Sequence, residues 1–197
     1  MVAIRETIQI GHPALKAINQ EIVDFADPKL TQLVQDLRET MYSAGLIGIA
    51  APQIGENFRV FITEPRETES RPADQADEFR VYINPVIVGK SKDEVIIWEG
   101  CGSVLEAALF GPVKRPREVE VEAYDIKAKK FRFRADGILG RVIQHESDHL
   151  DGIEFIEIVA DYKLLKSKKF YIKDEKNRQE HLKAQKITIK QYHEVRI

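Results

Sequence analysis

The sequence predicts an α+β fold in a single domain. Segments rich in β-branched and aromatic residues are grouped between residues 58 and 135, and helical patterns occur at residues 28–44 and 137–150. The length of 197 residues suits one domain, and 43% apolar with 31% charged residues is the balance of a globular protein. Disordered and collagen-like architectures are therefore excluded.

Charge and cysteine content narrow the class of function. The 30 basic and 32 acidic residues give a formal charge of −2, so no specific DNA partner is expected. The single cysteine, Cys101, excludes an internal disulfide and indicates a reducing compartment. Because no secretory or membrane-length apolar run occurs, we expect a cytoplasmic protein with no membrane partner.

The first helix is expected at residues 28–44. Asp27 suits the N-cap, Pro28 suits the first helical position, and Gly45 can end the helix. Apolar residues recur at helical spacing and predict one buried stripe, formed by Leu30, Leu33, Val34, Leu37 and Met41.

Three strands are expected in the middle of the chain, at residues 58–64, 81–88 and 95–98. Pro85 cannot donate a hydrogen bond to a neighbouring strand, which predicts a sheet edge or a bulge at that position. Between the first two strands, residues 65–78 are charged and turn-rich, and this composition predicts a mobile surface loop.

The second half of the chain predicts two more strands and a helix. Residues 118–124 and 130–135 alternate apolar and polar, typical of half-buried antiparallel strands, with a short turn at 127–129. A helix is expected at residues 137–150, with Asp136 as its N-cap and Gly152 at its end. Residues 163–190 carry ten Lys or Arg against three acidic residues. We therefore expect one domain over residues 1–197, with a basic C-terminal extension from about residue 160.

The pentapeptide HESDH at residues 145–149 is an HExxH motif inside the second predicted helix. Residues at i and i+4 share one helix face, so the imidazoles of His145 and His149 can bind one metal ion with Glu146 beside it. A pair of surface histidines is the alternative, which is disfavoured because the chain has only five histidines. The motif predicts a metal site with metal-assisted hydrolysis as its chemistry.

A hydrolytic metal site usually has three protein ligands and one open position, so a third ligand is needed. Phe155 stands where the long metallopeptidase motif requires a histidine, which excludes that motif. Glu154, Glu157 and Glu175 are candidates that nothing singles out. Cys101 is the stronger candidate because glycines on both sides allow close backbone approach, although a small buried apolar residue is its alternative role. A Cys-His-His set suits zinc and ferrous iron alike.

Residues 47–55, with the sequence IGIAAPQIG, are too rich in small residues for an ordinary helix and too apolar for a surface loop. Two interpretations fit this composition. The stretch is either a buried turn packed for space or a backbone edge that docks an extended substrate, with the amide of Gln53 as a donor.

Together these three stretches resemble the peptide deformylase family, enzymes that remove the formyl group from new polypeptides. The resemblance covers most of the chain and also includes GHPAL at residues 11–15, RP at 115–116 and DG at 136–137. It implies a small α+β domain in which antiparallel strands surround a central metal-binding HExxH helix.

The resemblance also implies a cofactor and a base. Cys101, His145 and His149 would hold one divalent metal ion, typically Fe²⁺ in this family, with Zn²⁺, Ni²⁺ or Co²⁺ as alternatives. Glu146 would take a proton from the attacking water and later pass it to the leaving amine. The substrates would be nascent N-formyl-methionyl polypeptides, and formate would be released.

Two further groups would act on the substrate. The amide of Gln53 and the backbone N–H of Gly102 would hold the oxygen of the tetrahedral intermediate. The chain around Ile47 and Gly48 would pair with the substrate backbone as an added strand. The residues expected to bind substrate are Leu46, Ile47, Gly48 and Glu99.

Three departures from the family pattern concern the substrate side. Leu46 stands where a glycine is usual two places before Gly48, and Gly102 replaces a leucine between the cysteine and the serine. After Ser103, the run VLEAALFG is apolar, longer than usual and without the usual proline and arginine. The candidate metal ligands and the catalytic glutamate are all kept.

Two functions stay open at this point. The first is an active deformylase with an altered pocket, and the second is a deformylase-like metal-binding protein with an altered substrate or little turnover. The intact Glu146 favours the first, while a general metallopeptidase leaves Cys101 and Gln53 unexplained. The basic C-terminal region suggests the ribosome as a partner through phosphate contacts, with an ordinary solvated helix as the alternative.

Overall fold

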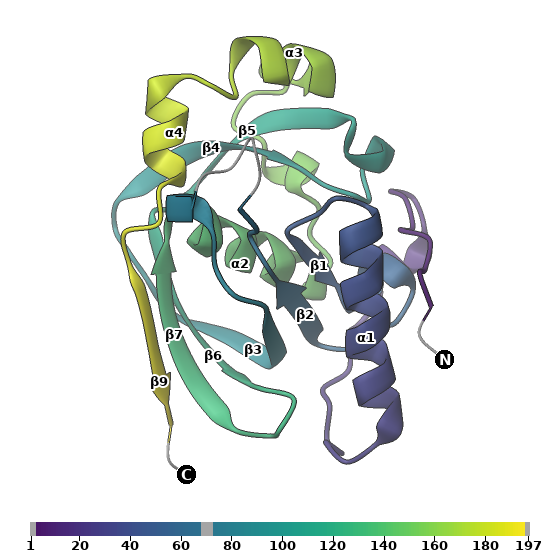
Figure 1. The fold of residues 1–197 in the computed structure, drawn as a ribbon. Coiled ribbons are helices and arrows are strands. Elements are labelled where there is room, and N and C mark those ends of the chain that lie inside the picture. The colour runs from purple at the N-terminus through teal and green to yellow at the C-terminus, as the bar shows by residue number, and fades with distance from the viewer. Residues whose placement is uncertain (1–2, 68–72, 196–197) are drawn as a thin grey trace.

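The computed structural model describes residues 3–67 and 73–195. Helix α2 (Gly137–Leu150) lies in the middle of the molecule, with strands on several sides of it (Figure 1). It packs against the larger of two antiparallel sheets, and its Arg141 side chain donates hydrogen bonds to carbonyls of the smaller one. The α+β class, with antiparallel strands around a central helix, is confirmed.

The larger sheet has the strand order β1-β2-β3-β6-β7-β9, and each neighbouring pair is antiparallel. Its strands are β1 (Gly48–Ala50), β2 (Val60–Thr63), β3 (Arg80–Lys90), β6 (Glu118–Tyr124), β7 (Lys130–Asp136) and β9 (Lys190–Glu194). The smaller sheet has the order β4-β5-β8, with β4 (Glu94–Gly100), β5 (Leu109–Pro116) and β8 (Lys166–Ser167).

Helix α1 (Pro28–Ser43) confirms the first predicted helix. The Asp27 carboxylate accepts a hydrogen bond from the Lys29 N–H, and Gly45 has a left-handed φ of 66° just beyond the helix. The predicted apolar stripe is buried in one core cluster that also contains residues of β1, β2 and β3. This cluster fixes the position of β1, the edge strand nearest to α1.

Pro85 lies in a bulge. The register of β3 against β6 shifts between Ile83 and Val86, and Asn84 has a φ of 49°. The alternative of a sheet edge is wrong, because β3 is paired on both sides. The side chain of Asn84 holds the bulge by bonding both the N–H and the carbonyl of Ile22.

The strands β6 and β7 confirm the predicted hairpin. Their exposed and buried residues alternate, and Asp125 accepts hydrogen bonds from the backbone N–H groups of Lys127 and Lys129 in the turn. Of the predicted mobile loop, residues 68–72 lie outside the described residues. Its last part carries Asp77, whose buried carboxylate is paired with Arg80 and Lys190.

Helix α2 begins and ends where the sequence predicts, and Asp136 occupies the predicted N-cap position without capping the helix through its side chain. The Asp136 side chain makes no capping bond to α2; it accepts hydrogen bonds from the N–H groups of Thr188 and Ile189. The reason is that the C-terminal segment passes directly over the start of the helix. A Cβ on Gly137 would lie 2.3 Å from the Lys186 carbonyl oxygen, so only glycine fits there.

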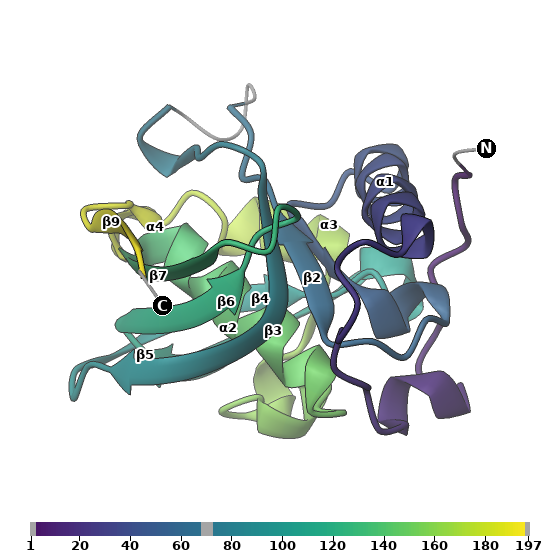
Figure 2. The same cartoon turned by 90° about the horizontal axis from the view of Figure 1, so that it is seen from below.

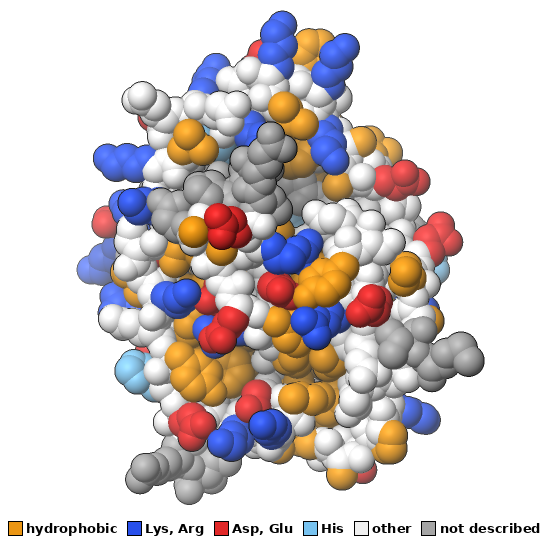
Figure 3. All heavy atoms as spheres, viewed as in Figure 1, with side chains coloured by type: hydrophobic (Ala, Val, Ile, Leu, Met, Phe, Trp, Pro, Cys, Tyr) orange, Lys and Arg blue, Asp and Glu red, His pale blue; other side chains and the backbone are white. Residues whose placement is uncertain are grey.

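The C-terminal elements were not predicted from the sequence. They are α3 (Lys168–Asp174), α4 (Gln179–Gln185) and β9, which extends the larger sheet beyond β7. Helix α1 and the pair α4 and β9 lie at opposite ends of that sheet (Figures 1 and 2). Lys and Arg side chains gather over α3 and α4 (Figure 3). None of the helices in the described ranges is long and apolar enough to cross a membrane.

Candidate metal centre

The three predicted ligands converge in the centre of the molecule. Helix α2 presents His145 and His149 on one face, and Cys101 follows the end of β4. The Cys101 Sγ lies 3.2 Å from His149 Nε2, and one ligand atom from each of the three residues falls within 4.8 Å of the others. All three side chains are buried.

This geometry fits a tetrahedral metal ion. Metal–sulfur and metal–nitrogen bonds of about 2.3 and 2.0–2.1 Å separate sulfur and nitrogen ligands by roughly 3.5 Å. Burial opposes ionisation of the Cys101 thiol, but the neighbouring His149 and His145 outweigh it and lower its pKa to about 6. The thiol is therefore prepared to bind as a thiolate, the form in which cysteine ligates metals.

Glu99 holds His145 in place. Its carboxylate oxygen lies 2.8 Å from His145 Nδ1, which leaves Nε2 of the ring for the metal. Arg115 donates two hydrogen bonds to Glu99 and Arg141 donates one. Although burial opposes ionisation, Arg115 and His145 hold the pKa of Glu99 well below its usual range. Glu99 is therefore a charged, fully hydrogen-bonded partner of a ligand.

A second carboxylate approaches the other histidine. The Oε1 atom of Glu154 lies 3.7 Å from His149 Nδ1, and both side chains are 1% exposed. Among the described residues, neither oxygen of Glu154 has a hydrogen-bond partner. Glu154 is not one of the three converging ligands, and Glu157 and Glu175 are bonded elsewhere, to Lys16 and Lys166.

Glu146 points its carboxylate toward β1. It is 4% exposed, and its burial raises the pKa to about 7. A base whose pKa lies near neutrality is well matched to proton transfer at neutral pH. Gly48 makes room for this side chain, because a Cβ there would lie 2.7 Å from Glu146 Oε1 and 2.5 Å from Val142 Cγ1.

The amide of Gln53 is fixed with its NH₂ group toward Cys101. Its Oε1 accepts the Ala50 N–H at 2.8 Å, so Nε2 is directed to Cys101 Sγ and Ser103 Oγ, at 3.4 and 3.3 Å. The carbonyl of Gly102 accepts a hydrogen bond from Gln9. No group in the described part of the chain accepts one from the Gly102 N–H. The Nε2 amide of Gln53 therefore approaches the Cys101 sulfur, and the Gly102 N–H is unpaired among the described residues.

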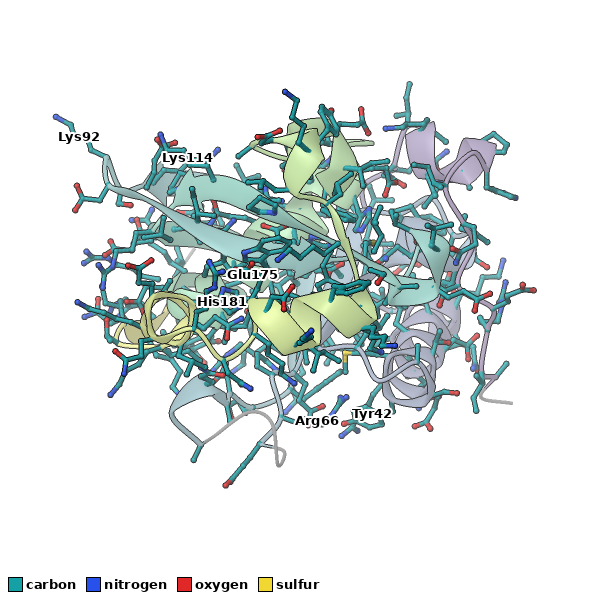
Figure 4. All side chains as sticks on the ribbon, turned by 90° about the horizontal axis from the view of Figure 1, so that it is seen from above. Tyr42, Arg66, Lys92, Lys114, Glu175 and His181 are labelled. Atoms are coloured by element: carbon teal, nitrogen blue, oxygen red, sulfur yellow. The ribbon has the colours of Figure 1, made fainter. Side chains whose placement is uncertain are left out.

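Strand β1 has an open edge beside the metal centre. The Ile47 carbonyl accepts a hydrogen bond from Glu64, on the side of β2, and alternation along an antiparallel strand directs the groups of Gly48 to the other side. The Leu46 carbonyl accepts a bond from Arg66, whose guanidinium stacks 4.6 Å from the Tyr42 ring. Figure 4 shows Arg66 and Tyr42 next to each other.

A pocket of about 340 Å³ joins this edge to the metal centre. It is lined by every substrate-binding residue predicted from the sequence, by Gln53, Gly102 and Glu146, and by two of the ligands, Cys101 and His145. His149 lies behind them. The sequence did not predict a role for Arg141 or for the α3 side chains that line the pocket, and it offered Glu154 only as a candidate third ligand. Arg141 had one available signal, since it precedes His145 by four residues on the same helix face.

The chain is similar in sequence to proteins of one family. Residues 4–164 match the family model described as polypeptide deformylase. A peptide deformylase of Roseiflexus sp. is 40% identical over an alignment of 175 residues, and the match covers 84% of this chain and 94% of that protein. One of Dictyoglomus turgidum is 36% identical over 166 residues, which are 84% and 99% of the two chains.

Solved structures of peptide deformylases are also similar to this chain. The crystal structure of a class I type b peptide deformylase from Acinetobacter baumannii with Met-Ala-Ser bound has a TM-score of 0.74 and 31% identity, and the match covers 81% of this chain and all of that one. The peptide deformylase from Thermotoga maritima has a TM-score of 0.71 and 26% identity over 81% of this chain and 99% of that one. The family match ends at residue 164, so residues 165–197 lie beyond it.

Proposed function

The chain belongs to the peptide deformylase family, and from this premise we propose that Cys101, His145 and His149 hold the divalent metal ion of its active site. The enzyme is a metal-dependent hydrolase that removes the N-formyl group from newly made polypeptides. The alternative of a metal-binding protein with little turnover is therefore not retained. The observation that carries the proposed site is the convergence of one thiol and two imidazoles beside the buried Glu146.

Each surrounding group has a role in the hydrolysis. When bound, a divalent ion supplies the Lewis acidity that makes water a nucleophile at neutral pH. Glu146 takes the proton of the attacking water and passes it to the leaving amine. The Nε2 amide of Gln53 and the N–H of Gly102 hold the oxygen of the tetrahedral intermediate. One such donor typically lowers the barrier by about 3–4 kcal/mol.

The substrate is placed by the pocket. Its backbone pairs with the open edge of β1, where Gly48 offers free backbone groups. The side chains of Leu46 and Ile47 line the same pocket, and Glu99 acts there by holding His145. A peptide ligand is in keeping with the similar Acinetobacter baumannii enzyme, whose crystal structure holds Met-Ala-Ser.

We propose ferrous iron as the native metal, with zinc, nickel and cobalt as ions that the same ligands accept. The test is formate release from formyl-Met-Ala-Ser by protein purified without oxygen and loaded with each ion. We expect turnover with at least one ion and at most a residual rate for Glu146→Ala. Equal rates for the wild type and Glu146→Ala would overturn the role of Glu146. A higher rate with zinc, nickel or cobalt than with iron would overturn the choice of iron.

We also propose the domain organisation, the cellular compartment and a further partner. One catalytic domain over residues 1–197 would include the basic C-terminal extension, which contributes to the pocket and the larger sheet. The substrates and the reduced thiol ligand favour the cytoplasm. A contact with ribosomal RNA phosphates is supported by basic side chains over α3 and α4. Cosedimentation with ribosomes across a salt series tests it, and absence of binding at low salt would overturn it.

A further inference from the structure

The outer wall of the active-site pocket is built by residues beyond the family match. Besides Cys101, His145 and Glu146, the pocket is lined by side chains of the C-terminal segment, namely Lys168, Tyr171, Ile172, Lys176 and Gln185. Four of them come from α3 and the turn after it. We call Lys168, Tyr171, Ile172 and Lys176 the α3 wall.

The α3 wall is held rigidly against the smaller sheet. The ring of Tyr171 stacks on Phe110 of β5, with centroids 4.2 Å apart and planes within 3°. Trp98 of β4 packs on the other part of the same ring at 5.9 Å. The Lys168 N–H also donates to the Ala108 carbonyl at 2.8 Å, just before β5 begins. The wall is therefore a fixed part of the pocket.

Two cations of the α3 wall have no counter-ion among the residues that the structure describes. Lys168 and Lys176 flank Ile172 at spacings of four residues, and within the described ranges no carboxylate lies within ion-pair distance of either ammonium group. The nearby acids are already engaged, since Asp174 and Glu175 both pair with Lys166. Figure 4 shows Glu175 beside His181. The outer end of the pocket therefore carries unneutralised positive charge.

The inner end of the pocket has no such excess. The charge of Glu99 is matched there by Arg115 and Arg141, and Glu146 remains buried without a cationic partner in the described residues. A ligand that spans the pocket thus meets the Glu146 carboxylate at one end and the ammonium groups of Lys168 and Lys176 at the other.

We propose that the α3 wall is a subsite for a carboxylate that the substrate carries downstream of its formyl-methionine. This inference deepens the proposed deformylation and depends on it. The aromatic and aliphatic side chains of Tyr171 and Ile172 accommodate a peptide, and the flexible ammonium groups of Lys168 and Lys176 attract the carboxylate. Such a carboxylate has two sources, an acidic side chain near the start of the polypeptide or the free C-terminus of a short peptide.

Kinetics on matched peptides test the subsite. We would compare kcat/KM for formyl-Met-Asp-Ser and formyl-Met-Ala-Asp amides with their Asn counterparts, and for formyl-Met-Ala-Ser acid with its amide. The first two comparisons detect a side-chain carboxylate, and the third detects a C-terminal one. We expect at least one acidic peptide to be favoured roughly two- to tenfold at low salt, as partly exposed ion pairs allow. The preference should shrink at high ionic strength.

The variant Lys168→Gln/Lys176→Gln should bring that preference close to one. Its matched control is Lys169→Gln/Lys173→Gln, which removes the same charge from α3 at two residues that do not line the pocket. A wild-type enzyme that turns over all peptides without preferring acidic ones would overturn the subsite alone, as would equal effects of the two double variants. A wild-type enzyme that releases formate from none of them would overturn the proposed function as well.

A separate observation concerns Glu154. Its carboxylate is buried beside His149, and within the described residues neither its oxygens nor His149 Nδ1 have a hydrogen-bond partner. Unlike Glu99, Glu154 has no arginine beside it; its backbone N–H is held by Glu157 at the start of a short 3₁₀ turn. A buried carboxylate of this kind needs a donor, and the only one in reach in the described structure is His149.

We infer that Glu154 is a positioning residue that accepts a hydrogen bond from His149 Nδ1–H when Nε2 faces the metal ion. Each ligating histidine then has its own carboxylate, Glu99 for His145 and Glu154 for His149. Partners of this kind fix the ring orientation and raise the basicity of the ligand, and their loss typically weakens metal binding by about 10- to 100-fold.

Cobalt binding tests this role without measuring activity. We would determine the Kd for Co²⁺ by competition with a chelator, and record the cobalt–thiolate absorption, for Glu154→Gln and Glu154→Leu. We expect weaker binding and an altered spectrum in both, and less change in Glu154→Gln, which retains an acceptor. Glu157→Gln is the control on the same turn. Unchanged Kd and spectrum in the folded Glu154→Leu protein would overturn the inference.

Discussion

Leu46 occupies the space in front of Gly102: its Cδ1 atom lies 2.9 Å from the position that a Cβ on Gly102 would take. These are two of the positions at which the sequence departs from the family pattern. One position has gained a leucine and the other has lost one, and the structure brings the two together. A leucine side chain therefore still fills this part of the pocket, but it comes from position 46 and not from position 102.

This relationship predicts coupling between the two positions. Gly102→Leu alone should crowd Leu46, and Leu46→Gly alone should open a gap and loosen the chain before β1. The double variant Leu46→Gly/Gly102→Leu should recover much of the lost kcat/KM. We expect a coupling free energy of about 1–2 kcal/mol in a double-mutant cycle. Strictly additive effects would show that the two departures are independent.

A second prediction concerns Gly48. A methyl group there would press on Val142 Cγ1 at 2.5 Å and on Glu146 Oε1 at 2.7 Å. Because a misplaced catalytic group is costly in rate, we expect Gly48→Ala to lower kcat by roughly 100-fold while metal content stays near one ion per chain. Gly89→Ala, in β3 and remote from the site, serves as the control. Loss of metal together with activity would mean that the substitution disturbs α2 rather than the base.

Much of the site was predictable because its residues are close in sequence or carry a motif. The helix at residues 137–150 and the pair His145 and His149 follow from local spacing alone. Cys101 is already favoured by its flanking glycines and by the need for a third ligand, and one of two interpretations of residues 47–55 makes Gln53 a donor. The resemblance implies their roles as metal ligand and as donor to the tetrahedral intermediate. Glu99 comes from a distant segment and Glu154 lies five residues beyond His149, past the end of α2, and only the fold shows that these carboxylates lie beside His145 and His149.

The rest of the fold escaped prediction for physical reasons. Strand β5 contains a glycine and two prolines, so its sequence does not look like a strand, yet it pairs along its length with β4. Every residue of β9 is exposed, so no alternation marks it. Asp136 holds the chain just before β9, although its place ahead of α2 in the sequence suggests only a capping role.

Removal of the metal should lower stability. The proposed ligands lie on α2 and at the end of β4, so a bound ion would join these elements. An ion that binds only the folded chain adds about 2.7 kcal/mol at a hundred times its Kd. For a chain of this size we expect chelation to lower Tm by roughly 5–10 °C. The measurement is a thermal unfolding scan with and without chelator. His149→Ala should show almost no chelator effect, and an equal shift in that variant would show that the ion acts elsewhere.

Stability should also depend on His181. Burial, reinforced by Arg141, lowers its pKa to about 4, against about 6.5 in an unfolded chain. The unfolded state therefore takes up this proton first, so the contribution is complete above pH 6.5 and is lost as the pH falls toward 4. We expect the free energy of unfolding of the wild type to fall by roughly 1–3 kcal/mol more than that of His181→Gln over this range.

Denaturant unfolding at a series of pH values measures this difference. The exposed His193→Gln is the matched control and should keep the wild-type slope. A His181→Gln protein with the wild-type pH dependence would show that His181 is protonated in the folded state. Because His181 contacts Tyr171, a lost contact would also loosen the wall of the pocket at low pH.

The last prediction separates two roles for Asp136. Its carboxylate accepts the N–H groups of Thr188 and Ile189 at 2.6 and 2.8 Å and also bonds the Thr188 hydroxyl. Asp136→Asn should remove this charged acceptor, lower the free energy of unfolding by about 1.5–3 kcal/mol and speed amide exchange in residues 187–194. Asp27→Asn is the control, because Asn and Asp serve equally well at an N-cap. If the Asp136 side chain capped α2, both substitutions would be nearly neutral; we expect only Asp27→Asn to be so.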